Sequence, residues 1–229
     1  MKIYGLEKFS MVDFPGHLCC TLFTGGCNFR CPYCQNGDLV NLTNLRLIEE
    51  QEIFEFLNKR KGAIDAVCIS GGEPTLYPDL PQFIAKIKAL GFLVKLDTNG
   101  TNPQILKSLI DKNLIDYVAM DIKSDELGYL SNFACSKADF EKVKESVNIL
   151  KQNKVPYEFR TTLVKQLHNE QNINAIATWL SGATNLYLQA FVDHPSNLTQ
   201  GLTRVDQQEA QIFAEILRKT IKNVELRGY

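Results

Sequence analysis

The sequence predicts an α/β fold, a partial and laterally open (β/α)6 barrel of the TIM type. Short apolar runs alternate along the chain with longer amphipathic stretches, at about the spacing that a β/α unit requires. Successive right-handed units build a parallel sheet that curves toward a barrel. Six such runs in 229 residues are too few for a closed barrel, which has eight units in about 250 residues. An open side can admit a large substrate.

The six apolar runs are the predicted strands. In chain order they read LCCTLF at 18–23, AVCIS at 66–70, LVKLD at 93–97, YVAMD at 117–121, YEFRT at 157–161 and LYLQAF at 186–191. The stretches between them have the apolar spacing of a helix with one buried face. The predicted helices cover residues 49–59, 79–90, 103–112, 137–152, 172–180 and 207–222.

Composition indicates one soluble globular domain over residues 1–229, with 45% hydrophobic and 22% charged residues. The chain has no Gly/Ser/Pro linker, and residues 1–17 and the last few are expected to be appendages to the barrel. A net charge of −1 with scattered cations argues against nucleic-acid binding. No apolar run reaches the roughly 18 to 20 residues of a membrane span, and residues 1–7 lack a signal-peptide pattern. We therefore expect a cytoplasmic protein without a membrane partner.

Three cysteines follow the first predicted strand, in the loop at residues 25–36. Cys27, Cys31 and Cys34 form a CxxxCxxC spacing, which is typical of a metal site. A cubane iron–sulfur cluster has four irons and normally four cysteines, so three would leave one iron open. Two alternatives remain at this point: a zinc site, which usually needs a second CxxC-like pair, and three unrelated cysteines.

Polar motifs also stand at the ends of the next strands, where β/α barrels place their chemistry. Gly71-Gly72-Glu73-Pro74 follows the second strand, and its glycines let the backbone approach a ligand closely. Asp97-Thr98-Asn99-Gly100 begins at the last residue of the third strand, and taken alone it is a turn. Asp121 ends the fourth strand and Lys123 lies two residues later on the same face, where a structural ion pair is the alternative to ligand binding.

With CxxxCxxC and Gly-Gly-Glu-Pro in this order and separation, the chain resembles the radical S-adenosylmethionine (SAM) superfamily over nearly its whole length. The resemblance implies that the three cysteines bind a 4Fe-4S cluster and that the methionine end of SAM chelates the fourth iron. Reductive cleavage of SAM would then release a 5′-deoxyadenosyl radical that takes a hydrogen atom from the substrate.

The same resemblance assigns contacts with SAM to further residues. Gly71, Gly72 and Glu73 would hold its amino group, and Asp97 and Asn99 would contact it. Asp121 and Lys123 would bind its methionine or ribose end, and Arg160 on the fifth strand would lie near its carboxylate. Tyr33, just before the last cysteine, and His194, after the sixth strand, are expected near the adenine. Gln35, on the other side of that cysteine, is also expected to contact the cofactor, although many activases have histidine there. No side chain needs to act as a general base.

The expected function is that of a glycyl-radical-enzyme activase, an oxidoreductase that cleaves SAM. The lead-in 8–16, with Asp13-Phe14-Pro15-Gly16, and the ending 224–228 resemble the proteins that activate anaerobic ribonucleoside-triphosphate reductase. The implied partners are that reductase and a flavodoxin or ferredoxin as electron donor. The alternatives are another radical SAM enzyme that acts on a peptide or small molecule, and a non-catalytic iron–sulfur protein. Cys19, Cys20 and Cys68 are expected in the core.

Overall fold

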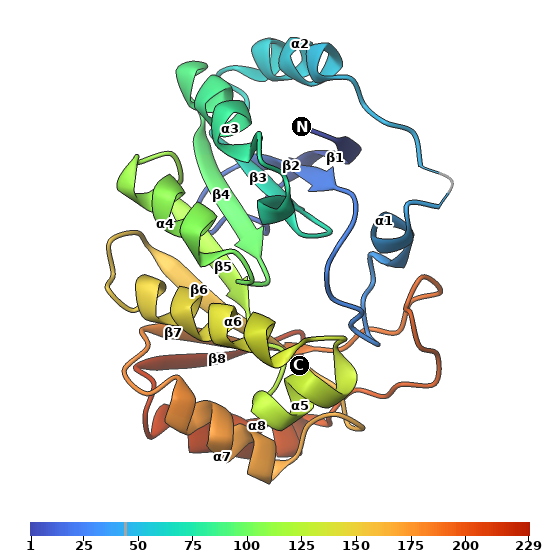
Figure 1. The fold of residues 1–229 in the computed structure, drawn as a ribbon, viewed down its shortest axis with the longest axis vertical. Helices are drawn as coiled ribbons and strands as arrows, with labels where there is room; N and C mark the ends of the chain where they lie inside the picture. Colours follow the sequence, from blue (N-terminus) through green and yellow to red (C-terminus); the bar gives the residue numbers. More distant parts are fainter. Residues whose placement is uncertain (44) are drawn as a thin grey trace.

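The computed structural model describes residues 1–43 and 45–229, which build one open eight-stranded sheet flanked by helices (Figure 1). The strands lie in chain order, and β1 (Ile3–Ser10) and β8 (Asn223–Arg227) form the two edges. β1 runs antiparallel to β2, and all later neighbours are parallel. The inner strands are β2 (Cys19–Thr24), β3 (Ala66–Gly71), β4 (Leu93–Thr98), β5 (Tyr117–Asp121), β6 (Tyr157–Leu163) and β7 (Asn185–Ala190).

The helices follow the strands as the β/α pattern predicts. The helices are α1 (Gly37–Asn41), α2 (Glu50–Arg60), α3 (Leu80–Ala89), α4 (Pro103–Asp111), α5 (Glu126–Asn132), α6 (Lys137–Leu150), α7 (Glu170–Trp179) and α8 (Gln207–Arg218). A short 3-10 helix, η1, covers Pro74–Leu76. All six predicted strands and six predicted helices are confirmed; α8 ends four residues earlier than predicted, because the chain after it turns into β8.

Two expectations need correction. Residues 1–17 and the last few residues are not appendages, because β1 and β8 are hydrogen-bonded strands of the sheet. Both edge strands carry exposed or half-buried positions, so neither shows the continuous apolar run of a strand buried on both faces. The short helices α1 and α5 were also not predicted, since five and seven residues are too few to establish a helical period.

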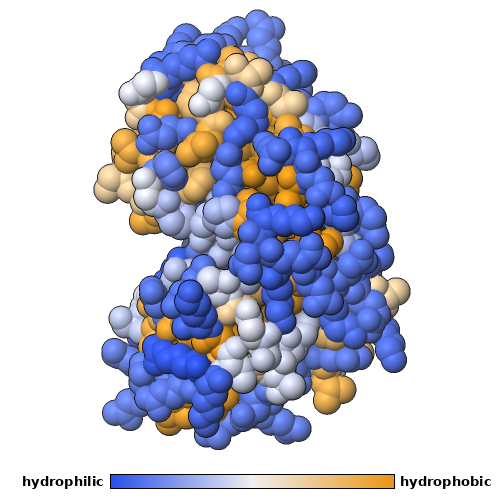
Figure 2. Space-filling model, turned by 90° about the vertical axis from the view of Figure 1, so that its left-hand side faces the viewer, coloured by the Kyte–Doolittle hydropathy of each residue, from blue (hydrophilic) through white to orange (hydrophobic). Residues whose placement is uncertain are grey.

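The apolar core lies between the sheet and its outer helices. Successive strand residues point to opposite faces, and buried Leu96 and Phe159 belong to the same cluster as Ile84 of α3 and Val143 of α6. The other face of the strands points into the barrel, and it is largely polar at the carboxyl ends of the strands. The outer helices turn charged residues to solvent, and Figure 2 shows a mostly hydrophilic surface with scattered hydrophobic patches on the side it presents. In the described part of the chain, every helix is too short or too polar to span a bilayer.

The segment that joins β1 to β2 forms the floor of the barrel. Phe14 is buried against Cys19, Ala66 and Tyr117, which lie at the amino ends of their strands. The carboxylate of Asp13 accepts a hydrogen bond from the Thr21 hydroxyl at 2.6 Å. The Asp13 backbone carbonyl accepts one from the buried Lys95 ammonium. The Asp-Phe-Pro-Gly motif therefore has a structural task at the end of the barrel opposite the strand-end motifs.

Replacing Phe14 with leucine should lower the free energy of unfolding by about 1 kcal/mol, because part of the floor contact is lost while the site stays apolar. Phe9, near the end of β1, is half exposed, so Phe9→Leu is the matched control and should change stability by less than about 0.5 kcal/mol. Chemical denaturation of both variants checks this. Equal effects of the two substitutions would contradict the floor role.

Candidate functional site

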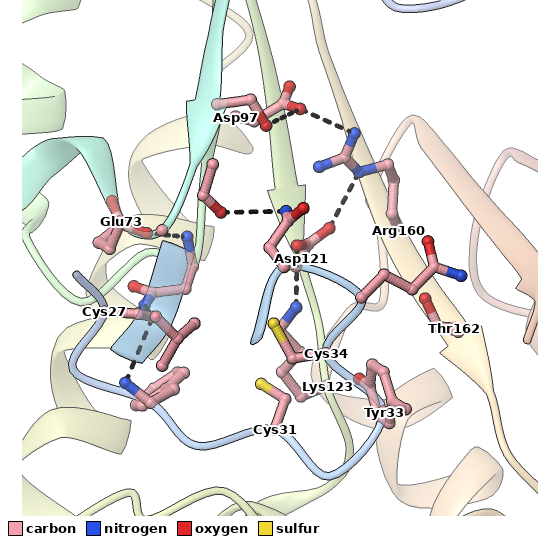
Figure 3. Close-up of a pocket in the computed structure, with 18 of the residues that line it drawn as sticks. Cys27, Cys31, Tyr33, Cys34, Glu73, Asp97, Asp121, Lys123, Arg160 and Thr162 are labelled. Carbon is pink, nitrogen blue, oxygen red and sulfur yellow. Dashed lines mark hydrogen bonds and ion pairs between the residues drawn. The ribbon is translucent and has the colours of Figure 1, made fainter. Parts of the chain in front are cut away.

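A cavity of about 370 Å³ opens at the carboxyl ends of the parallel strands (Figure 3). The strands end at one edge of the sheet, so residues far apart in the sequence meet there. Every predicted site residue except His194 lines it: Cys27, Cys31, Tyr33, Cys34, Gln35, Gly71, Gly72, Glu73, Asp97, Asn99, Asp121, Lys123 and Arg160. His194 is exposed, and its ring is hydrogen-bonded to the Ser196 hydroxyl.

The cysteine loop touches the Gly-Gly-Glu turn backbone to backbone. The Glu73 amide donates to the Gly26 carbonyl at 2.9 Å. A Cβ atom on Gly72 would lie 1.9 Å from that same carbonyl oxygen, so only glycine fits. Gly71 has φ of +108°, which other residues rarely adopt. The paired glycines thus permit the predicted close approach to the backbone of this turn, and the segment that approaches it is the cysteine loop.

Helix α5 supports the cysteine loop from a second side. The ring of Phe29 packs against that of Tyr129, and the ring of Tyr33 packs edge-on against that of Phe133. The Arg30 amide also donates to the Phe133 carbonyl at 3.1 Å. These contacts fix the side of the loop on which Cys31 lies, and they depend on a helix too short to predict.

The segment after β7, residues 191–201, holds the loop from a third side. The Thr199 amide donates to the Pro32 carbonyl at 2.9 Å, and the Gln35 side-chain amide donates to the Val192 carbonyl at 3.0 Å. The Ser196 hydroxyl donates to the Gln35 carbonyl. Figure 1 shows this segment beside α1 and the cysteine loop. Gln35 therefore ties two loops together while it lines the cavity.

Glu73 is a buried carboxylate whose oxygens are taken up by neighbouring donors. Its side chain accepts from the Thr75 amide and hydroxyl, the Thr98 hydroxyl and the Asn99 amide, at 2.6 to 3.0 Å. Burial raises its pKa, and these hydrogen bonds oppose that rise. Because Thr98 and Asn99 belong to the next strand end, Glu73 joins the Gly-Gly-Glu turn to the Asp-Thr-Asn-Gly turn. Its carboxylate is part of the framework of the site.

Glu73→Gln should lower the free energy of unfolding by about 2 kcal/mol. Either orientation of a glutamine amide places an NH2 group against a backbone N–H, of Thr75 or of Asn99, so one buried donor loses its acceptor. Urea unfolding checks the value. Glu55→Gln is the control, because Glu55 is exposed on α2. An unchanged midpoint for Glu73→Gln would contradict the framework role.

A chain of alternating charges lines the opposite wall of the cavity. Arg160 lies between two carboxylates: its Nε is 2.9 Å from Asp121 Oδ1, and its Nη1 is 3.3 Å from Asp97 Oδ2 (Figure 3). Lys123 Nζ is 2.8 Å from Asp121 Oδ2, and Lys95 Nζ is 3.3 Å from Asp97 Oδ1. Asp121 and Lys123 therefore form the structural ion pair that was the alternative to ligand binding, and both also line the cavity.

Asp121 pairs with both cations next to it in this chain, Arg160 and Lys123. Burial alone would raise the pKa of its carboxyl, but Arg160 and Lys123 outweigh that effect and lower the pKa to about 2. Asp121 also raises the pKa of Lys123 against the opposing effect of burial. Asp121, Lys123 and Arg160 are consequently charged at neutral pH, and they present fixed charges to a ligand in the cavity.

His168, which the sequence reasoning left out, positions the backbone of Lys123 from below. Its Nε2 lies 3.0 Å from the Lys123 carbonyl, so this nitrogen carries the proton and donates. Its Nδ1 accepts from the Val164 amide at 3.1 Å. The neutral ring thus satisfies both partners. Burial lowers the pKa of His168, while its backbone hydrogen bonds oppose this.

The stability of the wild-type protein should fall as the pH drops below about 6.5, the usual pKa of histidine in an unfolded chain. The folded state holds His168 neutral and lowers its pKa, so below that pH the unfolded chain takes up the proton first. The contribution is complete above the unfolded pKa and is lost toward the lower folded pKa. Thermal unfolding from about pH 7.5 to 5 should show a weaker slope in His168→Gln. Equal slopes would contradict the prediction.

The three thiols line one cavity, where each could bind a different iron of a 4Fe-4S cluster. Zinc would draw every sulfur to about 2.3 Å of one centre, whereas a cubane cluster takes each thiolate on a different iron. Burial raises the pKa of Cys27 to about 11 and of Cys31 to about 12. Bound iron would supply the positive charge that holds them as thiolates.

Several lining residues were not predicted as site residues. Thr162 lies two positions after Arg160 on β6, and Ser70 is the last residue but one of β3, so strand alternation could have found both. Val192 also lines the cavity, and nothing in the sequence around it signals that position.

Tyr33 was predicted as a site residue, and its hydroxyl is buried against the cavity, with no hydrogen-bond partner in the part of the chain that the structure describes.

Comparison with known proteins agrees with this geometry. Residues 21–180 match the model of the radical SAM superfamily. A Methanocaldococcus jannaschii protein named as a putative glycyl-radical enzyme activating enzyme is 34% identical over 232 residues, covering 98% of this chain and 95% of that protein. The pyruvate formate-lyase-activating enzyme of Clostridium pasteurianum is 30% identical over 157 residues, which is 65% of each chain.

Solved structures show the same fold at low sequence identity. A radical SAM methyltransferase from Sphaerobacter thermophilus superimposes with a TM-score of 0.69 at 14% identity, covering 93% of this chain and 67% of that chain. SuiB of Streptococcus suis bound to S-adenosylmethionine has a TM-score of 0.63 at 13% identity, covering 90% of this chain and 51% of that chain. These neighbours confirm the predicted open α/β barrel.

Proposed function

The chain belongs to the radical SAM superfamily, and on that basis we propose that it is an activase, which generates a glycyl radical on a partner enzyme. The observation that carries the proposal is the composition of one cavity. Three cysteines line it without a fourth, facing a wall of fixed charges. The similarity to named activating enzymes extends over almost the entire chain.

The superfamily uses a 4Fe-4S cluster and SAM as cofactors. When bound and reduced, the cluster cleaves SAM and so supplies a 5′-deoxyadenosyl radical, which takes a hydrogen atom from the substrate. In this chain Cys27, Cys31 and Cys34 would hold three irons. Their loop is fixed from three sides, so it would hold the cluster at the cavity.

The charged wall would bind the methionine end of SAM. Arg160 and Lys123 can neutralise its carboxylate, and Asp97 and Asp121 can accept from its ammonium or ribose hydroxyls. The Tyr33 ring and the Gln35 side chain flank the last cysteine at the cavity wall, where the adenine would lie. His194 would reach the adenine only if the 191–201 segment moved, because its side chain now faces solvent.

These residues serve the reaction by position. The loops exclude water from the space between the cysteines and the strand ends, and the charges fix the orientation of the cosubstrate. The glycine-bearing segment of the partner would enter beside Val192 and Gln35, at the open side of the barrel. A general base is not required, because the hydrogen is removed as an atom.

We further propose anaerobic ribonucleoside-triphosphate reductase as the partner and a flavodoxin or ferredoxin as the electron donor. Support comes from the resemblance of residues 8–16 and 224–228 to activators of that reductase. Because Phe14 packs at the floor of the barrel, part of that motif also has a structural reason that does not depend on the partner. The choice of partner is therefore tested by a direct experiment.

The experiment combines the anaerobically reconstituted protein, SAM and a reductant with the candidate reductase. We expect 5′-deoxyadenosine and a glycine-centred doublet in the electron paramagnetic resonance (EPR) spectrum. Cleavage of SAM without that doublet on any glycyl-radical enzyme offered would favour another radical SAM reaction. Bound iron with no cleavage under strong reduction would favour the non-catalytic alternative.

A further inference from the structure

The side chain of Asn28, in the cysteine loop, forms a closed ring of hydrogen bonds with those of Asn99 and Thr101, which follow β4. Asn99 Nδ2 donates to Asn28 Oδ1 at 2.9 Å, and Asn28 Nδ2 donates to Thr101 Oγ1 at 2.9 Å. The Thr101 hydroxyl donates to Asn99 Oδ1 at 2.7 Å, which closes the ring. The Thr101 amide also donates to Asn99 Oδ1, at 3.0 Å. Each member is thus oriented by the other two.

The ring fixes which way the Asn99 amide points. Its oxygen accepts two hydrogen bonds from Thr101, so its NH2 group must face the cysteine loop. One N–H is used by Asn28, and the other points at Cys27 Sγ, 3.8 Å away. Asn99 and Thr101 are each only 6% exposed, so water cannot readily replace these contacts.

Cys27 also accepts a backbone hydrogen bond from the Phe29 amide, at 3.4 Å. Among residues 1–43 and 45–229, Asn99 is the one side-chain amide seen to donate to a cysteine of the loop. An N–H directed at a thiolate is strengthened when the sulfur becomes more negative. Hydrogen bonds to the sulfurs therefore stabilise the reduced form of an iron–sulfur cluster and are one determinant of its potential.

We propose that Asn99, held by Asn28 and Thr101, is a positioning residue that directs an N–H at Cys27 and raises the reduction potential of the cluster. The inference rests on the cluster and not on the identity of the substrate. It also assigns Asn99 a task that is independent of any contact with SAM. Thr101 and Asn28 gain a role through Asn99, although the sequence reasoning assigned none to either residue.

The test measures the midpoint potential of the reconstituted protein without SAM, from the EPR signal of the reduced cluster. Asn99→Ala should make reduction harder by about tenfold in its equilibrium constant, which is about 59 mV for a one-electron couple. Thr101→Val removes the hydroxyl that orients Asn99 and should shift the potential in the same direction by less. Thr101→Ser keeps the hydroxyl and should match the wild type.

Iron content and circular dichroism must match the wild type in each variant that is compared. An unchanged potential in a fully loaded Asn99→Ala protein overturns the proposal. If Asn99→Ala fails to load, Thr101→Val decides, because its side chain is not seen to contact a cysteine of the loop. A potential equal to that of Thr101→Ser then overturns the proposal. Because no substrate is present, failure of the proposed activase function would leave these potentials unaffected.

Discussion

Replacing Cys31 with alanine is expected to abolish cluster binding and SAM cleavage together. The loop supplies three cysteines, and the remainder of the coordination is left to the cosubstrate, so the loss of one thiolate leaves an iron without a protein ligand. Cys31 is the most deeply placed of the three, with 8% of its surface exposed. Water or buffer therefore cannot substitute for it readily. Activity should fall below detection.

Cys135→Ala is the matched control, because Cys135 is also a buried free thiol but does not line the cavity. It should retain full iron and sulfide content and full cleavage of SAM. Both proteins are reconstituted anaerobically, and circular dichroism and thermal unfolding of the metal-free forms establish that Cys31→Ala still folds. A Cys31→Ala protein that keeps a complete cluster would contradict the ligand assignment. Loss of the cluster in Cys135→Ala would instead indicate a fourth cysteine ligand.

The inner strands of the fold could be predicted because they are buried on both faces. Parallel strands such as β3 and β5 read as continuous apolar runs, so their positions follow from the sequence alone. The edge strands β1 and β8 mix exposed and buried positions, and each pairs with a single strand, β2 and β7 respectively. Local pattern could not reveal them.

The site likewise has residues that a local sequence pattern reveals and contacts that it does not reveal. Cys27, Glu73 and Asp121 lie at or just after the ends of strands, and the order of the strands brings these ends together, so the motifs were sufficient to place them. The contacts of residues 191–201 with the cysteine loop join positions about 160 apart in sequence through backbone carbonyls, which leave no pattern. His168 acts through the Lys123 carbonyl in a comparable way. Such support could only be seen in three dimensions.

Asp121→Asn is expected to destabilise the protein and to abolish binding of SAM. Asp121 pairs with Arg160 and Lys123 at once, so the amide leaves two cations facing each other with one carboxylate fewer. Breaking a buried ion pair typically costs about 3 to 5 kcal/mol. We expect the lower end, about 3 kcal/mol, because Asp121 keeps 28% side-chain exposure at the cavity. The sulfonium of SAM would also meet an additional uncompensated positive charge.

Asp116→Asn is the matched control for ligand binding. Asp116 stands just before the same strand and pairs with Lys88 at 2.6 Å, but it lies outside the cavity. It should cost stability and leave SAM binding intact in the reconstituted protein, as measured by equilibrium dialysis. Wild-type binding by Asp121→Asn would contradict the proposed role of the charged wall.

The double variant Asp121→Asn/Arg160→Met separates the balance of charge from the contact with the ligand. Removing Arg160 together with the Asp121 carboxylate restores the net charge that the chain of charges has in the wild type. The double variant should therefore be more stable than the sum of the two single effects predicts. Urea unfolding of the four proteins gives this coupling free energy. SAM binding should nevertheless remain lost, because two of the four groups proposed to hold its methionine end have been removed. Recovery of stability without recovery of binding would show that the chain of charges serves the cosubstrate as well as the fold.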